Sequence, residues 1–320
     1  MAFDTPLTRM FEIDLPIVSA PMAFVAGGRL AAAVTEAGGL GLIGGGYGDP
    51  DWLEAEQRAA GNTPVGIGFI AWRLKDRPEL LTQALALKPR AALLSFADIA
   101  PYAHAVKSSG ARLIAQVQTV AQARRAAAAG ADLIVAQGTE AGGHNGLRAT
   151  LPLVPAVVDA VGPLPVLAAG GIADGRGLAA ALTLGAAGVL VGSALVAATE
   201  ALVAPAAQAR LTAASGDETA RGSEVDLLRG YDWPDGYKIR TLDTPFLAAM
   251  RAAPPKDQAA VEALRQAYEA ARADGDLTVT PVIAGEAADL IRQTAPAADI
   301  LQAMAIQAEQ ILRARPGLKA

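Results

Sequence analysis

Short runs of apolar residues recur along the first two hundred positions, and segments of helical character separate them. The runs are continuous rather than alternating, which is typical of parallel strands covered on both faces. Eight such runs are present: Ile17–Ala20, Gly41–Ile43, Val65–Phe69, Ala92–Ser95, Leu113–Val117, Leu133–Ala136, Val166–Ala169 and Val189–Val191. Eight strand-then-helix units predict an α/β fold of the (β/α)₈ or TIM-barrel class, with a doubly wound open sheet as the alternative.

The spacers between these runs have the pattern expected of helices, and several of them end at a glycine. The predicted helices are Arg29–Ala37, Asp51–Ala60, Glu79–Leu87, Ile99–Ser108, Ala121–Ala129, Leu153–Val161 and Gly177–Leu184.

The alternation of strands and helices stops after Thr199. Beyond it the sequence has the aromatic run Gly230–Tyr237, and it predicts a helix near Lys256–Ala273, a strand at Leu277–Ile283 and helices at Glu286–Thr294 and Ile300–Arg313. We expect residues 1–205 to form the barrel and residues 280–320 to complete its wall. Residues 206–279 are then a helical and irregular insert or lid, and an independent helical domain is the alternative.

Composition and charge exclude several classes of function. The chain has 320 residues, no cysteine, and 27 Lys and Arg against 32 Asp and Glu, for a net charge of −5. The lack of cysteine excludes a disulfide scaffold, a cysteine nucleophile and an iron–sulfur cluster. Without a basic excess, nucleic acid is not an expected partner.

Neither a leader nor a membrane span is expected. The opening residues offer no apolar stretch of the kind that a secretory signal has, so the expected compartment is the cytoplasm. The segment 177–199 is uncharged and about as long as a span, but glycines divide it into helix, turn and strand.

Two glycine-bearing loops follow the seventh and eighth predicted strands. They contain Gly170 and Gly171 in the first, and Gly192 and Ser193 in the second. In a barrel of this class a phosphate commonly lies in these two loops, where backbone N–H groups, a hydroxyl and a helix N-terminus can bind it. The pair predicts a phosphate site, and plain structural turns are the alternative.

Histidine occurs only twice. His104 lies mid-helix and is expected to have a surface or packing role, whereas His144 follows the sixth strand, flanked by Gly142 and Gly143. Those glycines suit a loop whose backbone presses against a flat ligand, and an imidazole can transfer protons near neutral pH. His144 is therefore the candidate catalytic residue. With two histidines and no cysteine, no metal site is expected.

The first strand ends in Ala20, Pro21 and Met22. A flat apolar cofactor could stack there, since methionine adapts to an aromatic face and proline fixes the approach of the chain. Loop punctuation is the alternative explanation.

Together these motifs resemble a known family. The runs Pro21–Met22, Ala37–Gly41, Ala136–His144 and Ala168–Gly177 are similar to those of the nitronate monooxygenases, formerly 2-nitropropane dioxygenases, and the similarity continues through Trp233–Pro234 and Ala284–Glu286. Other flavin reductases of quinones and enoyl thioesters look similar at the same motifs.

The resemblance implies an FMN at the barrel mouth. Its phosphate would lie on Gly170, Gly171, Gly192 and Ser193, its ring against Ala20, Pro21 and Met22, and His144 near its reactive edge. In the family reaction an alkyl nitronate, or its parent nitroalkane, is oxidised with O₂ to a carbonyl compound and nitrite. The implied partners are thus small molecules, and the sequence allows a homodimer.

Three positions depart from the family pattern. Gly68 stands where relatives have an asparagine that contacts the flavin, and Gln116 matches a lysine found in some of them. Ser193 replaces a threonine after the eighth strand, a change that phosphate binding should tolerate.

Two other functions remain open beside nitronate oxidation. One is an FMN-dependent reductase that takes hydride from NADH or NADPH to a quinone or enoyl thioester. The other is a flavin-binding protein without turnover, against which the intact loop around His144 speaks.

Overall fold

The computed structural model describes residues 3–48 and 50–314. Eight parallel strands form the central sheet, in the order β1-β9-β8-β6-β5-β4-β3-β2. They are β1 (Ile17–Ser19), β2 (Leu42–Gly46), β3 (Gly66–Ile70), β4 (Ala91–Ser95), β5 (Arg112–Val117), β6 (Leu133–Gln137), β8 (Val166–Ala169) and β9 (Gly188–Val191). Each lies within a few residues of a predicted run.

The two ends of this sheet meet. Val18 forms a parallel bridge with Leu40, and the Ser19 N–H donates to the Leu40 carbonyl at 3.0 Å. The sheet is therefore a nearly closed barrel, which confirms the predicted fold class and excludes the open doubly wound sheet.

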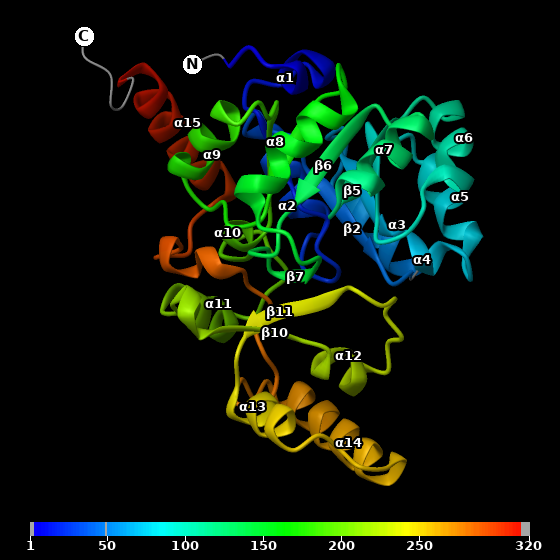
Figure 1. The fold of residues 1–320 in the computed structure, drawn as a ribbon, viewed down its shortest axis with the longest axis vertical. Helices are drawn as coiled ribbons and strands as arrows, with labels where there is room; N and C mark the ends of the chain where they lie inside the picture. Colours follow the sequence, from blue (N-terminus) through cyan, green and yellow to red (C-terminus); the bar gives the residue numbers. More distant parts are fainter. Residues whose placement is uncertain (1–2, 49, 315–320) are drawn as a thin grey trace.

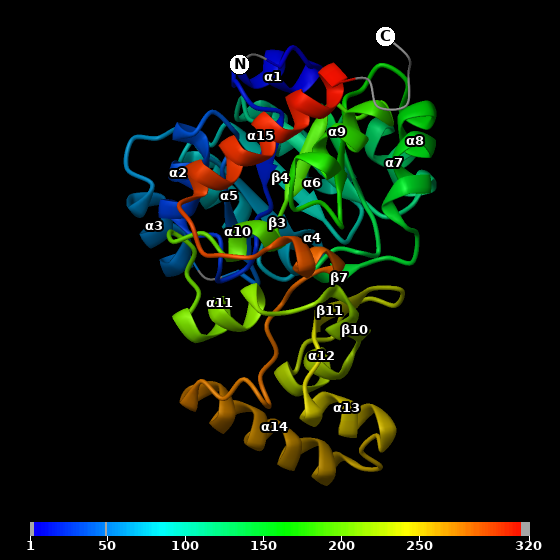
Figure 2. The same cartoon turned by 90° about the vertical axis from the view of Figure 1, so that its left-hand side faces the viewer.

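Helices surround the barrel (Figure 1). They are α2 (Gly28–Glu36), α3 (Pro50–Ala59), α4 (Ala71–Leu74), α5 (Pro78–Ala86), α6 (Ala100–Ser108), α7 (Val120–Ala128), α8 (Thr150–Val161), α9 (Gly175–Thr183), α10 (Ser193–Val196) and α15 (Ala297–Ala314). The terminal helix α15 packs against both α9 and α2 (Figure 2), so it fills the gap in the wall that the lid's insertion leaves after β9.

Alternate residues of the strands point inward and outward, and both sets are apolar. Leu42, Leu93, Leu133 and Leu167 belong to the cluster inside the barrel, whereas their neighbours pack on the helices. Helix α1 (Pro6–Phe11) closes the amino-terminal end of this interior.

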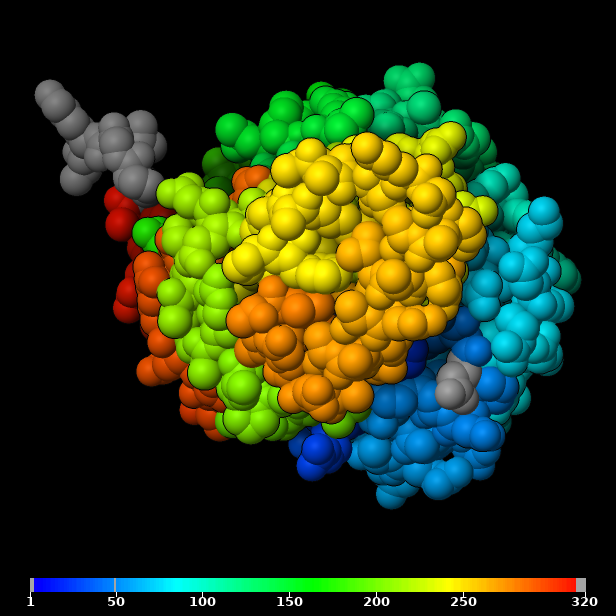
Figure 3. Space-filling view, turned by 90° about the horizontal axis from the view of Figure 1, so that it is seen from below, coloured from blue at the N-terminus to red at the C-terminus, as the bar shows by residue number. Residues whose placement is uncertain are grey.

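A second unit covers the carboxyl ends of the barrel strands (Figures 1 and 3). We call residues 206–279 the lid. Its elements, with the helix that leads into it, are α11 (Pro205–Thr212), η1 (Gly216–Glu218), β10 (Thr219–Gly222), α12 (Glu224–Arg229), β11 (Lys238–Leu242), α13 (Pro245–Ala252) and α14 (Gln258–Asp274).

The lid is joined to the barrel by a small antiparallel sheet. Its order is β10-β11-β7, and β7 (Gly143–Asn145) comes from the chain that leaves strand β6. One barrel segment is thus an edge strand of the lid's sheet.

Two predicted elements after the lid are wrong. Leu277–Ile283 is not a strand, because Asp276 accepts hydrogen bonds from the backbone of Thr278 and Thr280 and so turns the chain. In place of a helix at Glu286–Thr294 there is only a 3₁₀ helix, η2 (Glu286–Leu290).

Residues 3–48 and 50–314 contain neither a candidate membrane span nor a candidate metal cluster. None of their helices is long and apolar enough to cross a membrane. None of their His, Asp and Glu side chains gather in a group of three or more that could hold a metal ion.

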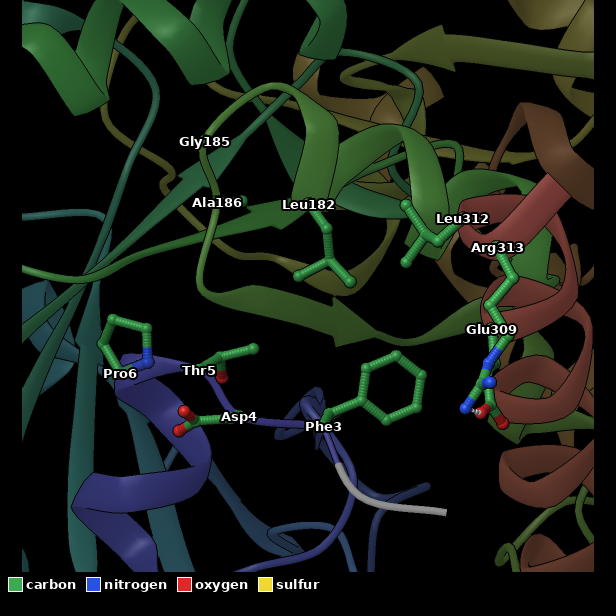
Figure 4. Close-up of a pocket in the computed structure, with 10 residues that line it drawn as sticks. All are labelled: Phe3, Asp4, Thr5, Pro6, Leu182, Gly185, Ala186, Glu309, Leu312 and Arg313. Atoms are coloured by element: carbon green, nitrogen blue, oxygen red, sulfur yellow. Dashed lines mark ion pairs between the residues drawn. The ribbon is translucent and has the colours of Figure 1, made fainter. Parts of the chain in front are cut away.

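A hollow of about 590 Å³ lies beside helices α1 and α15 (Figure 4), which are at the opposite end of the molecule from the lid (Figure 1). Phe3, Leu182, Leu312 and the Glu309–Arg313 ion pair line it. In barrels of this class chemistry takes place at the carboxyl ends of the strands, so this hollow is not the candidate site.

Candidate active site at the barrel mouth

Small and flat groups from three strand ends form one surface at the barrel mouth. A Cβ atom on Gly68 would lie 2.2 Å from Pro21 Cγ, so Pro21 fills the space that a side chain would need. A Cβ atom on Gly192 would lie 3.4 Å from Ala20 Cβ and 3.6 Å from Met22 Sδ. The structure therefore brings Ala20, Pro21, Met22, Gly68 and Gly192 together.

The two glycine loops lie side by side, because β8 pairs with β9. Gly170 and Gly171 have φ angles of 99° and 71°, which other residues rarely adopt. Within residues 3–48 and 50–314, the backbone N–H groups of Gly171 and Ser193 donate to no protein acceptor. The Ser193 hydroxyl accepts from the Gly285 N–H at 2.9 Å and keeps its own hydrogen to donate. These free donors suit an anion.

The N-terminus of helix α9 is not available to this anion site. Asp174 caps α9 and accepts from the backbone N–H groups of Arg176 and Gly177 at 2.9 and 3.4 Å. The Gly175 N–H donates to Gln307 Oε1. The first turn of α9 is therefore already satisfied, and the donors that remain for a ligand are the Gly171 N–H and the N–H of Ser193, the first residue of helix α10.

His144 lies on strand β7 rather than in an open loop. Its backbone pairs with Ile239 of β11, and its carbonyl accepts from Gln137 Nε2 at 3.0 Å. Gln137 Oε1 in turn accepts from Gln118 Nε2 at 2.8 Å. The lid holds this strand from one side and the barrel holds it from the other.

Asp226 of α12 binds the His144 ring. Both carboxylate oxygens lie within hydrogen-bond distance of Nε2, at 2.9 and 3.0 Å, and each of the two side chains is 7% exposed. Because a carboxylate only accepts, Nε2 carries the hydrogen and Nδ1 is left with its lone pair. None of the described residues forms a hydrogen bond with Nδ1. The pair therefore leaves Nδ1 as the nitrogen that can take a proton.

Burial controls the charge of His144. It lowers the pKa of the imidazole below its ordinary value of 6.5, while the hydrogen bond to Asp226 acts in the opposite direction and is the weaker effect. His144 is therefore neutral at pH 7, in the form that can act as a base.

Aromatic rings surround this pair. The Trp233 ring lies flat on His144, with centroids 3.3 Å apart and an angle of 9° between the planes. Two residues earlier in the same lid loop, Tyr231 stacks on Tyr47 at 3.9 Å. The Trp233 indole N–H donates to the Tyr47 hydroxyl at 3.1 Å, and burial raises the pKa of that phenol.

The other three predicted site residues lie near this centre. Gln116 is half-buried on β5. A Cβ atom on Gly142 would lie 2.7 Å from the backbone of Ala284 and Gly285, so this glycine lets the chain returning from the lid cross close by. Gly143 pairs with Arg240 of β11. Their contact with a flavin stays a prediction.

Comparison with known proteins shows the family. The model described as nitronate monooxygenase matches residues 4–72 and 80–307. The chain belongs to the nitronate monooxygenase family. It is 34% identical to the nitronate monooxygenase npaC of Metarhizium robertsii, over 92% of this chain and 91% of that protein. FabK from Thermotoga maritima superimposes with a TM-score of 0.87 at 32% identity and covers 99% of both chains.

A third relative carries a different name. The (3aS,4S,5R,7aS)-5-hydroxy-7a-methyl-1-oxo-octahydro-1H-indene-4-carboxyl-CoA dehydrogenase of Mycobacterium tuberculosis is 38% identical over 71% of this chain. The match spans 65% of that relative, just under two thirds of its length. This chain is thus similar to proteins that are named for different reactions.

This family member is a flavin-dependent oxidoreductase. The mouth fits such a cofactor on two independent observations. The loop of Gly171 and Ser193 offers N–H and hydroxyl donors that no protein atom uses. The small side chains over Gly68 and Gly192 leave a smooth surface on which a ring can lie.

Sequence reasoning missed Asp226 and the role of the lid aromatics. Asp226 lies 82 residues after His144, and no local motif joins the two positions. The run Gly230–Tyr237 did carry a signal, because it concentrates aromatic residues in a chain that is only 4% aromatic.

Proposed function

We propose that this protein oxidises nitronates with O₂, on FMN, to carbonyl compounds and nitrite. The observation that carries the proposal is the buried His144–Asp226 pair at the mouth, next to a surface that fits a flavin. Membership of the nitronate monooxygenase family supports the same reaction.

The cofactor proposed is FMN rather than FAD. Paired glycine loops after β8 and β9 offer donors for one terminal phosphate. A pyrophosphate usually needs a Gly-x-Gly-x-x-Gly turn after an early strand. The turn after β1, residues Pro21–Gly27, lacks this glycine spacing. We infer that Gly170, Gly171, Gly192 and Ser193 hold the phosphate.

The flavin would accept electrons from the substrate and pass them to O₂. The chain's own residues handle the proton. A neutral nitroalkane must lose its α-proton before oxidation, and Nδ1 of His144 is the free basic atom that can take it. Asp226 would stabilise the imidazolium that forms and keep the ring in place. A preformed nitronate needs no such base.

We also infer that residues 206–279 act as a lid in function. Asp226 and Trp233 both belong to this segment and both contact His144. The complete site therefore exists only when the segment is docked on the barrel.

A reductase is the second candidate function. The likeness to FabK covers 99% of both chains, and the Mycobacterium tuberculosis relative is named as a dehydrogenase of a CoA thioester. A nicotinamide would need no second nucleotide fold if it stacked over a flavin in the barrel.

One anaerobic experiment separates the two candidates. Flavin-loaded protein is mixed separately with propane-2-nitronate, NADH and NADPH, and flavin absorbance is followed. Bleaching by the nitronate, with nitrite release when air is admitted, supports the proposal. Bleaching only by a reduced nicotinamide contradicts it and favours the reductase. Cofactor released by heat should be FMN, and FAD would contradict the phosphate assignment.

A further inference from the structure

A cavity of about 340 Å³ lies between the ends of strands β4 and β5, helix α7 and the lid loop. Its lining includes Phe96, whose ring contacts His144, and the charged residues Asp98 and Arg125. We call it the side cavity and define it by six of its lining residues: Trp72, Phe96, Gln116, Gln122, Pro234 and Tyr237. It is more than twice the size of an engineered cavity of ~150 Å³ that binds benzene. Its volume falls in the range of small-molecule sites.

Three aromatic residues from distant parts of the chain line the cavity: Trp72, Phe96 and Tyr237. The Trp72 and Trp233 rings meet edge to face at 5.4 Å. Gln122 Nε2 donates to the Tyr237 hydroxyl at 2.8 Å and fixes that wall. The cavity is therefore a preformed space with flat faces.

Phe96 joins the cavity to the proposed base. Its ring lies edge to face with His144 at 6.3 Å, with Trp233 at 5.0 Å and with Tyr237 at 5.3 Å. Its φ angle is 66°, a left-handed conformation that is strained for a bulky residue. Backbone strain of this kind is typical of functional sites, and here the conformation places the Phe96 ring between the side cavity and His144.

One polar group of a cavity-lining residue lacks a partner. The indole Nε1 of Trp72 is buried without any acceptor among the described residues. A buried N–H without an acceptor is costly, so this indole is explained by a ligand that offers an oxygen. Gln116 lines the same cavity, and its half-buried amide is a second group that can donate there.

We propose that the side cavity binds the planar ring of an aryl substrate that carries an oxygen acceptor. This inference rests on the proposed function, in which the substrate is then an aryl nitronate rather than a short alkyl one. The ring stacks among the aromatic walls, its oxygen accepts from Trp72 or Gln116, and its reacting carbon faces His144.

Binding to flavin-loaded protein tests the cavity without any turnover. The matched probes are acetophenone and cyclohexyl methyl ketone, which share a carbonyl and differ in the planarity of the ring. We expect acetophenone to bind ~10-fold more tightly by calorimetry, on the scale of a well-placed aromatic contact, because both ketones can accept the same hydrogen bond. Equal affinities, or acetophenone binding that flavin loading abolishes, would overturn the proposal; in the second case the cavity belongs to the flavin.

Substitutions of two tryptophans test whether the preference for the planar ketone arises in the side cavity. Trp72→Leu should remove the preference for the planar ketone, and Trp72→Phe should keep the preference but weaken binding, because it retains the wall and loses the N–H. Trp52→Leu is the matched control, since Trp52 lies outside the cavity lining. A loss of preference in Trp52→Leu equal to that in Trp72→Leu would contradict the assignment.

Turnover separates this inference from the proposed function. The nitronates of phenylnitromethane and of (nitromethyl)cyclohexane are compared by kcat/KM, and we expect the phenyl compound to be favoured ~10-fold or more. Equal oxidation of both, with equal ketone affinities, rejects the cavity proposal and keeps nitronate oxidation. Oxidation of neither, with selective binding of acetophenone, rejects nitronate oxidation and keeps the cavity.

Discussion

The barrel and the lid differ in how each is held together. The barrel buries two aliphatic clusters, one inside its strands and one beneath its helices. The lid has a single small cluster, made of Val225, Leu228, Ile239, Leu247, Met250 and Tyr268. A cluster of this size is a poor basis for independent stability. The lid therefore depends on its docking to the barrel.

Two arginines show what the docking consists of. Arg221 donates to the Asn145 side chain and carbonyl at 2.6 and 2.9 Å. Arg240 donates to the Thr139 carbonyl at 3.0 Å and pairs with Glu286 at 2.8 Å. These contacts connect strands β10 and β11 of the lid to strand β7, which carries His144, and to the turn that precedes it.

The chemistry is divided along the same boundary. The glycine loops belong wholly to the barrel, whereas the His144–Asp226 pair joins a barrel segment to the lid. Substitutions in the barrel loops should therefore mainly weaken cofactor binding. Substitutions in the lid should mainly slow proton transfer.

His144→Ala should have the largest effect. Turnover of a neutral nitroalkane should fall by roughly 10²–10⁴-fold, the usual scale of general base catalysis, and that of the preformed nitronate far less. The measurement is steady-state kinetics on one compound in both forms, with flavin content checked. Unchanged rates on both forms in a flavin-replete variant would show that His144 has only a packing role.

Leu228→Ala should loosen the lid alone. The side chain is 2% exposed in the lid cluster, and its loss should cost ~2–5 kcal/mol of local stability. Hydrogen exchange should then rise across 206–279 while the barrel keeps its flavin. Leu227→Ala is the control, because Leu227 is 37% exposed. If exchange rose equally in the barrel, the two units would unfold as one.

Asp226→Asn should weaken proton transfer without removing the base. Loss of the charge-assisted hydrogen bond should reduce kcat/KM for a neutral nitroalkane roughly 10- to 100-fold. The variant Asp232→Asn, in the exposed part of the same lid, should be near wild type.

The pH dependence of activity tests the direction in which Asp226 shifts the pKa of His144. Activity that needs neutral His144 rises with pH through the imidazole pKa, which burial holds below 6.5. Asp226 raises that pKa, so its replacement should move the acid limb to lower pH. A limb that moved to higher pH would show that Asp226 does not act on His144 in this way.

Gly170→Ala tests the barrel's side of the comparison, and Gly110→Ala is its matched control. Both glycines have a positive φ, 99° and 86°, but a Cβ atom on Gly170 would lie 2.9 Å from the Gly138 carbonyl, whereas Gly110 has open space. We expect both to lower Tm, and Gly170→Ala alone to weaken FMN binding, by ~1–3 kcal/mol. Equal FMN affinity in the two variants would remove the phosphate assignment.

The barrel could be predicted because local sequence patterns specify its strands and helices. Each strand is a short continuous apolar run and each helix a periodic one, so eight repeats of the unit specify the class. The glycine loops were found for the same reason, since their positions follow from the strand count. The prediction of a strand at Leu277–Ile283 was wrong because these residues pair with no neighbouring strand and Asp276 turns the chain.

Local sequence patterns were therefore enough to predict the barrel, its mouth and the single histidine expected there. Only the folded chain shows that Asp226 meets His144 from a helix 82 residues further along, and that Trp233 lies flat on the same ring. It also decided that Trp72, Phe96 and Gln116 share one cavity. Local patterns report burial and backbone period, but the pairing of a lid with a barrel depends on contacts whose partners are far apart along the chain.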